Sequence, residues 1–214
     1  MDVVLYKDII VADNFITDEE NDVLVSLIDK KICYNTENYW QYLQSDERTY
    51  PLRILKSGDG IYRQSTVFTS VTVNNVFTEI RNKLLQLINI PGLKIENSGI
   101  IKYSNAVTYR VDNMVTEKEH ILGSPSVIID NHNEYNEYTG KWVQNPICWN
   151  RFYHCHIFIN NDFIGGNFTF PQHKIDITPT RNSLLCFLGN QHYVHGVRPI
   201  DGSSFALKLW LSKS

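Results

Sequence analysis

The chain has 214 residues, of which 43% are hydrophobic and 20% charged, and its formal net charge at pH 7 is −3. These values exclude wholesale disorder, and the weakly acidic balance without a Lys/Arg-rich run argues against a nucleic-acid-binding surface. No apolar run approaches the ~20 residues of a membrane-spanning helix, and the acidic Asp2 near the start argues against a secretory signal. We therefore expect a cytoplasmic or nuclear protein of one domain, residues 1–214, that binds neither nucleic acid nor membrane; its oligomeric state has no sequence signal.

The first part of the chain predicts one strand and two helices. Residues 3–15 (VVLYKDIIVADNF) read as an opening strand. Thr17 and Glu20 then form a capping box, in which each side chain can bond the backbone amide of the other. A helical apolar face follows, made of Val23, Leu24, Leu27, Ile28 and Ile32. A second amphipathic helix fits residues 75–89 and is ended by Pro91.

From about Glu96 onward the sequence consists of short β-like runs separated by Asn, Gly and Pro. Such spacing is typical of an antiparallel sandwich or barrel. The chain is therefore expected to be α+β, with residues 1–95 as helical and strand support and residues 96–214 as the core. The runs 151–160 and 204–212 alternate apolar residues and contain no proline, so we expect them to be central strands.

Two runs in the second half carry the clearest functional signal. Residues 160–171 read NNDFIGGNFTFP, and His195 opens the run HGVRPIDGSSFALKLW. Together they resemble the C-terminal half of the double-stranded β-helix oxygenases, and the prolyl hydroxylases in particular. Residues 63–65 (Arg-Gln-Ser) are similar to that family's Arg-Thr-Ser, and residues 151–160 to its Arg…Tyr-Leu-Asn strand. The pattern of the leprecan-type prolyl 3-hydroxylases is the most similar.

This resemblance implies a fold and a function. The fold is a double-stranded β-helix (jelly-roll, cupin-like) core with N-terminal helices packed on one sheet. The function is an Fe(II)/2-oxoglutarate-dependent dioxygenase that hydroxylates a peptidyl or amino-acid substrate, with ascorbate as an accessory reductant. The alternative, from another class, is a catalytically inactive oxygenase fold that serves as a protein- or peptide-binding module.

The resemblance also implies metal ligands, and here the sequence departs from the family. Such a site needs two histidines and one carboxylate, and His195 stands at the family's distal histidine. Aligning the downstream motifs without gaps places Ile128, which cannot bind iron, at the first histidine. Either Asp130 and His132 form the pair in reversed order, Asp-x-His, on the same strand face as Ile128, or His132 and Glu134 form an intact His-x-Glu pair that is followed by a shorter loop. The third reading is that no ligand pair exists.

A second departure concerns 2-oxoglutarate. The family uses an Arg or Lys about ten residues beyond the distal histidine to bind its outer carboxylate; the alignment places Ser204 there. Lys208, on the same strand face, is either the substitute cation or an ordinary lysine at a sheet edge. His154 and His156 share a face with Phe158, which stands where the family has a pocket-lining tyrosine. We expect this face to line the cofactor cavity; a cupin-type His-x-His metal site is the competing reading.

The four cysteines are Cys33, Cys148, Cys155 and Cys186, and no two of them form a Cys-x-x-Cys pair. Such scattered cysteines are typical of reduced thiols in an intracellular protein. They predict neither a disulfide framework nor a zinc site.

Overall fold

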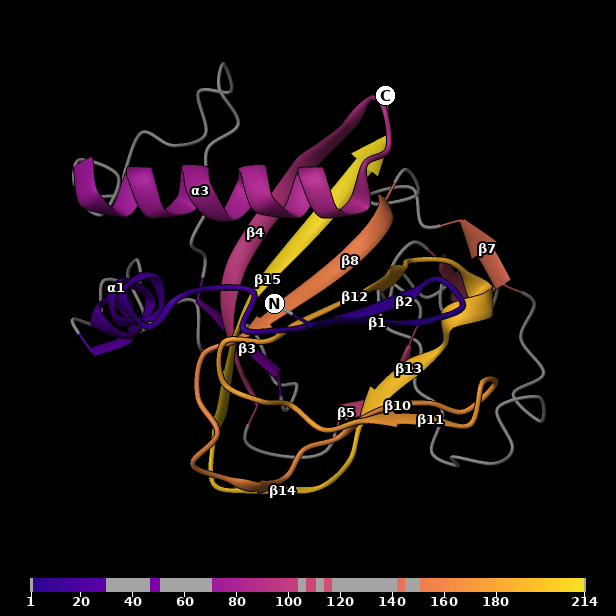
Figure 1. The fold of residues 1–214 in the computed structure, drawn as a ribbon. Coiled ribbons are helices and arrows are strands. Elements are labelled where there is room, and N and C mark those ends of the chain that lie inside the picture. The colour runs from indigo at the N-terminus through magenta and orange to yellow at the C-terminus, as the bar shows by residue number, and fades with distance from the viewer. Residues whose placement is uncertain are drawn as a thin grey trace.

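The computed structural model describes residues 2–29, 47–50, 71–103, 107–110, 114–116, 142–144 and 151–213. Within these ranges the chain forms antiparallel sheets and two α-helices, an α+β architecture (Figure 1). The helices are α1 (Asp18–Asp29) and α3 (Val71–Ile88), and a short 3-10 helix, η4 (Gln191–Tyr193), lies near the end of the chain. None of the helices in the described ranges is long and apolar enough to cross a membrane.

The larger sheet has seven strands, all paired antiparallel. Their order is β1 (Asp2–Tyr6), β2 (Ile9–Asp13), β12 (Leu184–Leu188), β8 (Arg151–Phe158), β15 (Ser204–Lys213), β4 (Leu93–Tyr103) and β3 (Glu47–Tyr50). The expectation for the two long runs is confirmed, because β8 and β15 lie side by side in the middle of this sheet. Both strands therefore have partners on each side, which suits runs without proline.

A second sheet has four strands, in the order β11 (Ile175–Ile177), β10 (Phe168–Phe170), β13 (His195–Val197) and β5 (Val107–Arg110). Two short ladders complete the described strands: β9 (Ile164–Gly165) with β14 (Ile200–Asp201), and β6 (Met114–Thr116) with β7 (Trp142–Gln144). The strand β13 begins at His195, so the first three residues of the run that opens on His195 lie in the smaller sheet, and the run continues into β15 of the larger sheet.

The single opening strand predicted for residues 3–15 is wrong. The segment folds as a hairpin of β1 and β2, closed by the register pair Tyr6–Ile9 around the two-residue turn Lys7-Asp8. Lys7 adopts φ 58°, a left-handed conformation that turns normally assign to Gly or Asn. Because no glycine or asparagine stands here, the sequence has no turn signal.

Helix α1 begins as the sequence predicts. The Thr17 amide donates to Glu20 Oε2 at 2.8 Å, and the Glu20 amide donates to Thr17 Oγ1 at 3.2 Å, so the capping box is confirmed. Glu20 also accepts a hydrogen bond from Lys83 Nζ on α3 at 2.7 Å, which ties the two helices together. Helix α3 starts at Val71, four residues before the predicted Asn75, and ends at Ile88 ahead of Pro91.

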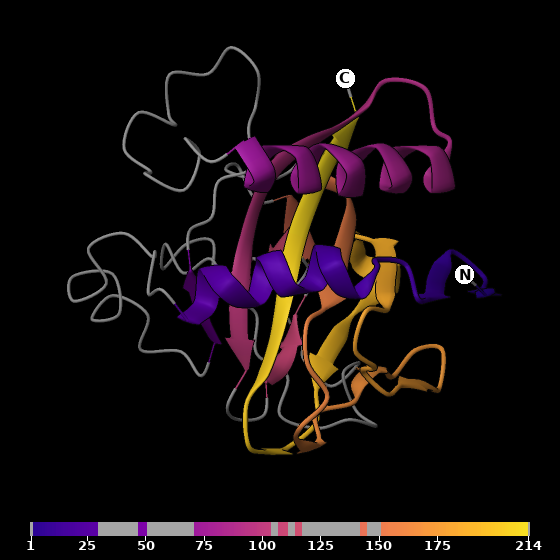
Figure 2. The same ribbon diagram turned by 60° about the vertical axis from the view of Figure 1, so that its left-hand side comes forward.

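Two hydrophobic cores flank the seven-stranded sheet. Both helices lie across one face of this sheet (Figures 1 and 2), where they bury Leu24, Phe77, Ile80, Leu84 and Ile88 against the strands. The other face packs against the four-stranded sheet, and the core between the two sheets is rich in aromatic residues: Tyr103, Phe158, Phe168, Phe170, Phe187 and Trp210. Because strand side chains alternate between faces, each central strand contributes to both cores.

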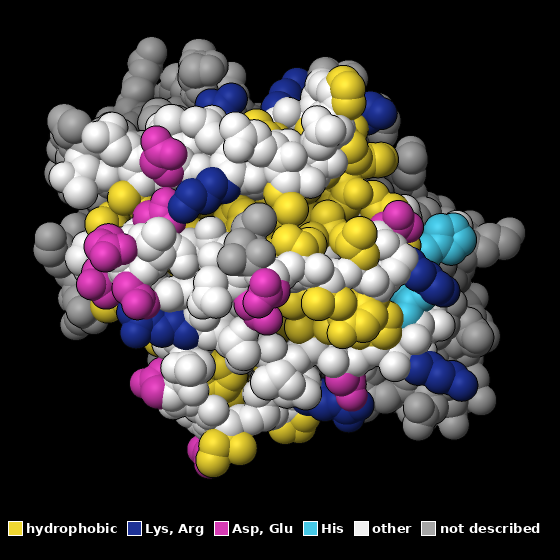
Figure 3. All heavy atoms as spheres, in the orientation of Figure 1, with side chains coloured by type: hydrophobic (Ala, Val, Ile, Leu, Met, Phe, Trp, Pro, Cys, Tyr) yellow, Lys and Arg dark blue, Asp and Glu magenta, His cyan; other side chains and the backbone are white. Residues whose placement is uncertain are grey.

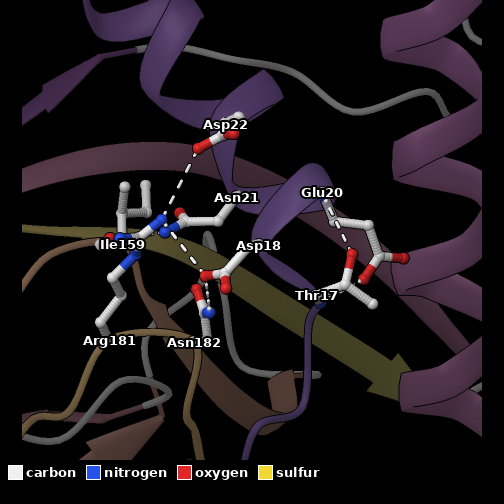
Figure 4. A network of polar contacts seen from close by, with 8 residues as sticks. All are labelled: Thr17, Asp18, Glu20, Asn21, Asp22, Ile159, Arg181 and Asn182. Carbon is white, nitrogen blue, oxygen red and sulfur yellow. Dashed lines mark hydrogen bonds and ion pairs between the residues drawn. The ribbon is translucent and has the colours of Figure 1, made fainter.

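A polar network fixes the start of α1 on the sheet (Figure 4). Arg181 Nη2 lies 3.3 Å from Asp18 Oδ1 and 3.6 Å from Asp22 Oδ1. The buried Asn21 donates from Nδ2 to the Ile159 carbonyl at 2.9 Å, just beyond β8. The helix is thereby joined to the end of the strand that carries His154 and His156.

Candidate functional site

The candidate site lies in the core between the two sheets, and alternating residues of β8 and β15 build its floor. Leu207 and Leu209 face the helices, whereas Trp210 faces the smaller sheet. By the same alternation Lys208 faces the smaller sheet, as its register partner His156 does. The sequence-derived expectation that alternate residues of these strands share an interior face is therefore met.

Lys208 is a buried cation in the middle of a sheet. Its exposed fraction is 3%, and it belongs to β15, which has β8 on one side and β4 on the other. The reading of Lys208 as a lysine at a sheet edge is therefore wrong. Its Nζ lies 4.8 Å from the centroid of the Trp210 ring, a favourable cation–π contact. Lys208 is therefore a charged hydrogen-bond donor on the interior face of the sheet.

His195 points into the same interior. Its exposed fraction is 3%, and its ring centroid lies 4.6 Å from Phe187 and 5.6 Å from His154. Its Nδ1 is 3.1 Å from the Tyr193 carbonyl oxygen. A carbonyl only accepts hydrogen bonds, so Nδ1 carries the proton and Nε2 keeps the lone pair that a metal ion requires.

Tyr193 is itself anchored, which fixes the carbonyl that orients His195. The Tyr193 hydroxyl donates a hydrogen bond to Asp8 Oδ2. Burial and this hydrogen bond raise the pKa of Tyr193 to about 12. The phenol thus stays protonated across the physiological range, and the turn between β1 and β2 is held against the segment that precedes β13.

His154 and His156, both on β8, belong to the floor of the site. The ring of His154 stacks on Trp210 at 5.5 Å with an interplanar angle of 15°, and it lies 4.5 Å from His156. His156 Nδ1 is 3.4 Å from the Tyr103 hydroxyl oxygen. Phe158, further along the strand, stacks on His156 at 6.2 Å, so the expected common face of these three residues is present.

Two further polar groups face this interior. Ser204 is the register partner of Tyr103 at the far end of the floor, and its side chain is 2% exposed. Its hydroxyl and the Trp210 indole Nε1–H have no hydrogen-bond partner among the residues that the structure describes. Buried donors of this kind are normally satisfied, so both groups are suited to a polar ligand.

The residues beside His195 within its own sheet cannot bind a metal. On one side, β5 places Arg110 at the register position opposite His195. On the other side, Phe170 of β10 has its ring centroid 6.2 Å from the His195 ring. A phenyl ring has no lone pair, and a guanidinium stays protonated.

No group of three His, Cys, Asp or Glu side chains suited to a metal occurs within the described ranges. His195 is the one predicted ligand inside those ranges. Ile128, Asp130, His132 and Glu134 all lie outside the described residues.

Sequence reasoning missed the position of Arg110. No local sequence signal could have found it, because the pairing of β5 with β13 joins strands that are far apart in the chain.

The sequence also did not predict a contact between cysteines. Cys155 of β8 and Cys186 of β12 are register partners, both are fully buried, and their sulfur atoms lie 2.8 Å apart as free thiols. They face the helices, on the opposite side of the sheet from His154 and His156. Burial, together with the neighbouring Cys186, raises the pKa of the Cys155 thiol well above its usual range.

Several solved structures of prolyl hydroxylases have a fold similar to that of this chain. A viral collagen prolyl hydroxylase of Paramecium bursaria Chlorella virus-1, in complex with 2-oxoglutarate, matches with a TM-score of 0.57 over 97% of each chain, at 14% identity. The fold is prolyl hydroxylase-like. A prolyl hydroxylase of Trichoplax adhaerens, in complex with a peptide of a hypoxia-inducible factor, matches with a TM-score of 0.52 over 96% of this chain and 84% of its own, at 11% identity.

A third structure agrees with these two. A prolyl 4-hydroxylase of Phytophthora capsici matches with a TM-score of 0.55 over 97% of this chain and 59% of its own, at 12% identity. No protein-family model matches the chain, and no curated protein matches its sequence. The likeness is therefore one of fold, and the function has to be argued from the site.

Proposed function

We propose that the chain is an Fe(II)- and 2-oxoglutarate-dependent hydroxylase of the prolyl hydroxylase type, built on a double-stranded β-helix core. One observation carries the proposal: a buried ammonium, Lys208, and a buried imidazole, His195, whose Nδ1 lies 3.1 Å from the Tyr193 carbonyl oxygen, face the same interior. A dicarboxylate co-substrate and a divalent metal need a fixed cation and a neutral imidazole, respectively.

In this proposal Lys208 binds the outer carboxylate of 2-oxoglutarate. A charge-assisted hydrogen bond from the ammonium is the strongest single contact that this interior can offer to a carboxylate. The Ser204 hydroxyl, 2% exposed at the far end of the same face, supplies a further donor. His156 and Phe158 lie beside these residues on the neighbouring strand β8, where His156 pairs with Lys208 and Phe158 pairs with Ala206.

Iron would be held by His195 through Nε2, with the remaining ligands from Asp130, His132 and Glu134. Bound there with 2-oxoglutarate, iron supplies the oxidation of a substrate C–H bond. The protein's part is to orient the His195 ring through the Tyr193 carbonyl, 3.1 Å from Nδ1, and to surround the site with aromatic rings. A hydrogen-bond partner of the ring nitrogen that does not bind the metal fixes the tautomer of a metal-bound histidine.

The substrate class that we propose is a peptidyl or free amino acid. The support is the likeness to a prolyl hydroxylase of Trichoplax adhaerens solved with a peptide, at a TM-score of 0.52.

A second candidate function is a binding module without oxygenase chemistry. The observation that favours it is the register position opposite His195, which holds an arginine, a residue type that does not bind a metal ion. In this case the interior binds an acidic ligand through Lys208, and no metal takes part.

One experiment separates the two candidates. The purified full-length chain is titrated anaerobically with Fe(II) and then 2-oxoglutarate, and the metal-to-ligand charge-transfer absorption is followed; succinate is measured after O2 is admitted. The hydroxylase proposal expects a saturable absorption band and iron-dependent succinate, and both should be lost in His195→Ala. The matched control is His192→Ala, an exposed histidine three residues earlier. Absence of the band and of succinate in the wild-type chain would overturn the proposal in favour of the binding module.

A further inference from the structure

Strand β1 is an apolar strand at the outer edge of the seven-stranded sheet. It pairs with β2 on one side only, and all of its residues are exposed. Val3, Val4 and Tyr6 expose 41–44% of their surface and Leu5 exposes 65%. The hairpin projects from one side of the molecule in Figure 2, and Figure 3 shows hydrophobic side chains gathered along it.

The strand is apolar on both of its faces. Val3 and Leu5 lie on the face that carries the helices, and Val4 and Tyr6 lie on the face of the smaller sheet. The two hydrophobic cores include residues of β2 and none of β1, so the side chains of β1 lie outside both cores. Edge strands of monomeric proteins usually carry a lysine, a proline or a bulge that prevents pairing. Residues 2–6 contain none of these, and their register with β2 is regular.

The hairpin geometry determines which backbone groups face outward. Tyr6 and Ile9 close a two-residue turn, and such a closing pair is hydrogen-bonded between its own strands. Hydrogen-bonded and non-hydrogen-bonded pairs alternate along an antiparallel ladder. Val4 therefore also bonds to β2, whereas the N–H and C=O groups of Val3 and Leu5 point away from the sheet.

We propose that two copies of this chain pair through β1, antiparallel and about a two-fold axis at Val4. In this register Val3 lies opposite Leu5 of the partner subunit, so the outward groups of one copy meet those of the other. Val4 lies opposite Val4 of the partner subunit, in a non-hydrogen-bonded pair. The pairing joins the two seven-stranded sheets into one continuous sheet and removes an exposed edge.

A second copy fits this edge because the strand complements itself. Asp2 stands at one end of β1 and Lys7 directly after its other end. Antiparallel pairing brings the Asp2 carboxylate of each copy toward the Lys7 ammonium of the other, and opposite charges at strand ends favour this orientation. A parallel arrangement would place like charges together. A two-fold interface of this kind is isologous, the commonest way in which identical chains associate.

The first test measures the mass of the full-length chain by sedimentation equilibrium across a range of concentrations. The expected result is a dimer, twice 24.9 kDa, that dissociates on dilution. Leu5→Lys should give a monomer because it adds a charge to the edge. Leu5→Pro should do the same, since it removes the N–H of Leu5, which points away from the sheet and is not hydrogen-bonded to β2. Ile164→Lys is the matched control: it removes a side chain that is 75% exposed on β9 and should leave the dimer intact.

The second test examines the register. Val4→Cys should form a disulfide between two copies under mild oxidation, because non-hydrogen-bonded partners have Cα atoms about 4.5 Å apart, within disulfide reach. Tyr6→Cys, on the same face but displaced from the two-fold axis, should not. A wild-type chain that is monomeric at every concentration overturns the proposal. So does a dimer that survives both Leu5 substitutions, and cross-linking of Tyr6→Cys in preference to Val4→Cys overturns the register. These readouts need neither iron nor 2-oxoglutarate.

Discussion

Lys208 and His156 are direct register partners on the two central strands, and both side chains are almost completely buried. The Tyr103 hydroxyl oxygen lies 3.4 Å from His156 Nδ1. An ammonium, an imidazole and a phenol thus share the floor of one interior, across the neighbouring strands β15, β8 and β4. Each of these three groups can donate a hydrogen bond.

The first prediction concerns Lys208. Lys208→Ala should weaken 2-oxoglutarate binding by ~1.5–3 kcal/mol, roughly ten- to a hundredfold in Kd, because a hydrogen bond to a charged group is lost. Isothermal titration calorimetry measures the effect. Lys213→Ala is the matched control, since Lys213 is exposed near the end of the same strand. Equal affinities of the Lys208→Ala variant and the wild-type chain would remove this residue from the co-substrate site.

The second prediction concerns the position opposite His195. Arg110→His should increase the affinity for Fe(II) or Mn(II), because it places a second imidazole at the register position opposite His195. Anaerobic calorimetry with each metal measures it. Arg110→Gln removes the cation without adding a good ligand and should bind metal less tightly than Arg110→His. If the two variants bind metal equally, position 110 does not face the metal.

The third prediction concerns the buried thiols and pH. Burial raises the pKa of Cys155 above its usual range, so the folded state holds this proton more tightly than the unfolded state. The resulting stability is fully present below the unfolded pKa of about 8.5 and declines as the pH rises above it. Denaturant unfolding from pH 7 to 10 should show this decline. Cys155→Ala should show a smaller decline, and equal slopes would contradict the assignment.

The fourth prediction concerns helix α1. Thr17→Ala should lower the free energy of unfolding by about 1 kcal/mol, because it removes the hydroxyl that accepts from the Glu20 amide. Urea denaturation followed by circular dichroism measures the loss. Thr178→Ala, at an exposed position after β11, is the control and should change stability by a few tenths of a kcal/mol at most. A loss of the same size in both variants would speak against the cap.

The sequence by itself determined the local features of this protein. The capping box of Thr17 and Glu20 depends on residues three apart, and the common face of His154 and His156 depends on the two-residue period of a strand. The central place of β8 and β15 followed from their apolar alternation. Hydrogen bonding within one turn and side-chain periodicity act over a few residues, so a linear pattern records them.

Only the tertiary structure decided which distant residues meet. That Arg110 stands opposite His195, and that Cys155 touches Cys186, depends on the register between strands far apart in the chain. The burial of Lys208 depends on the smaller sheet that packs over this face of β15, which the sequence of β15 does not specify. Strand pairing is a long-range choice made by the packing of the whole core, and a shift of one residue would exchange the two faces of a strand. The local pattern therefore predicted the kinds of group in the site, and the long-range register decided which of them share it.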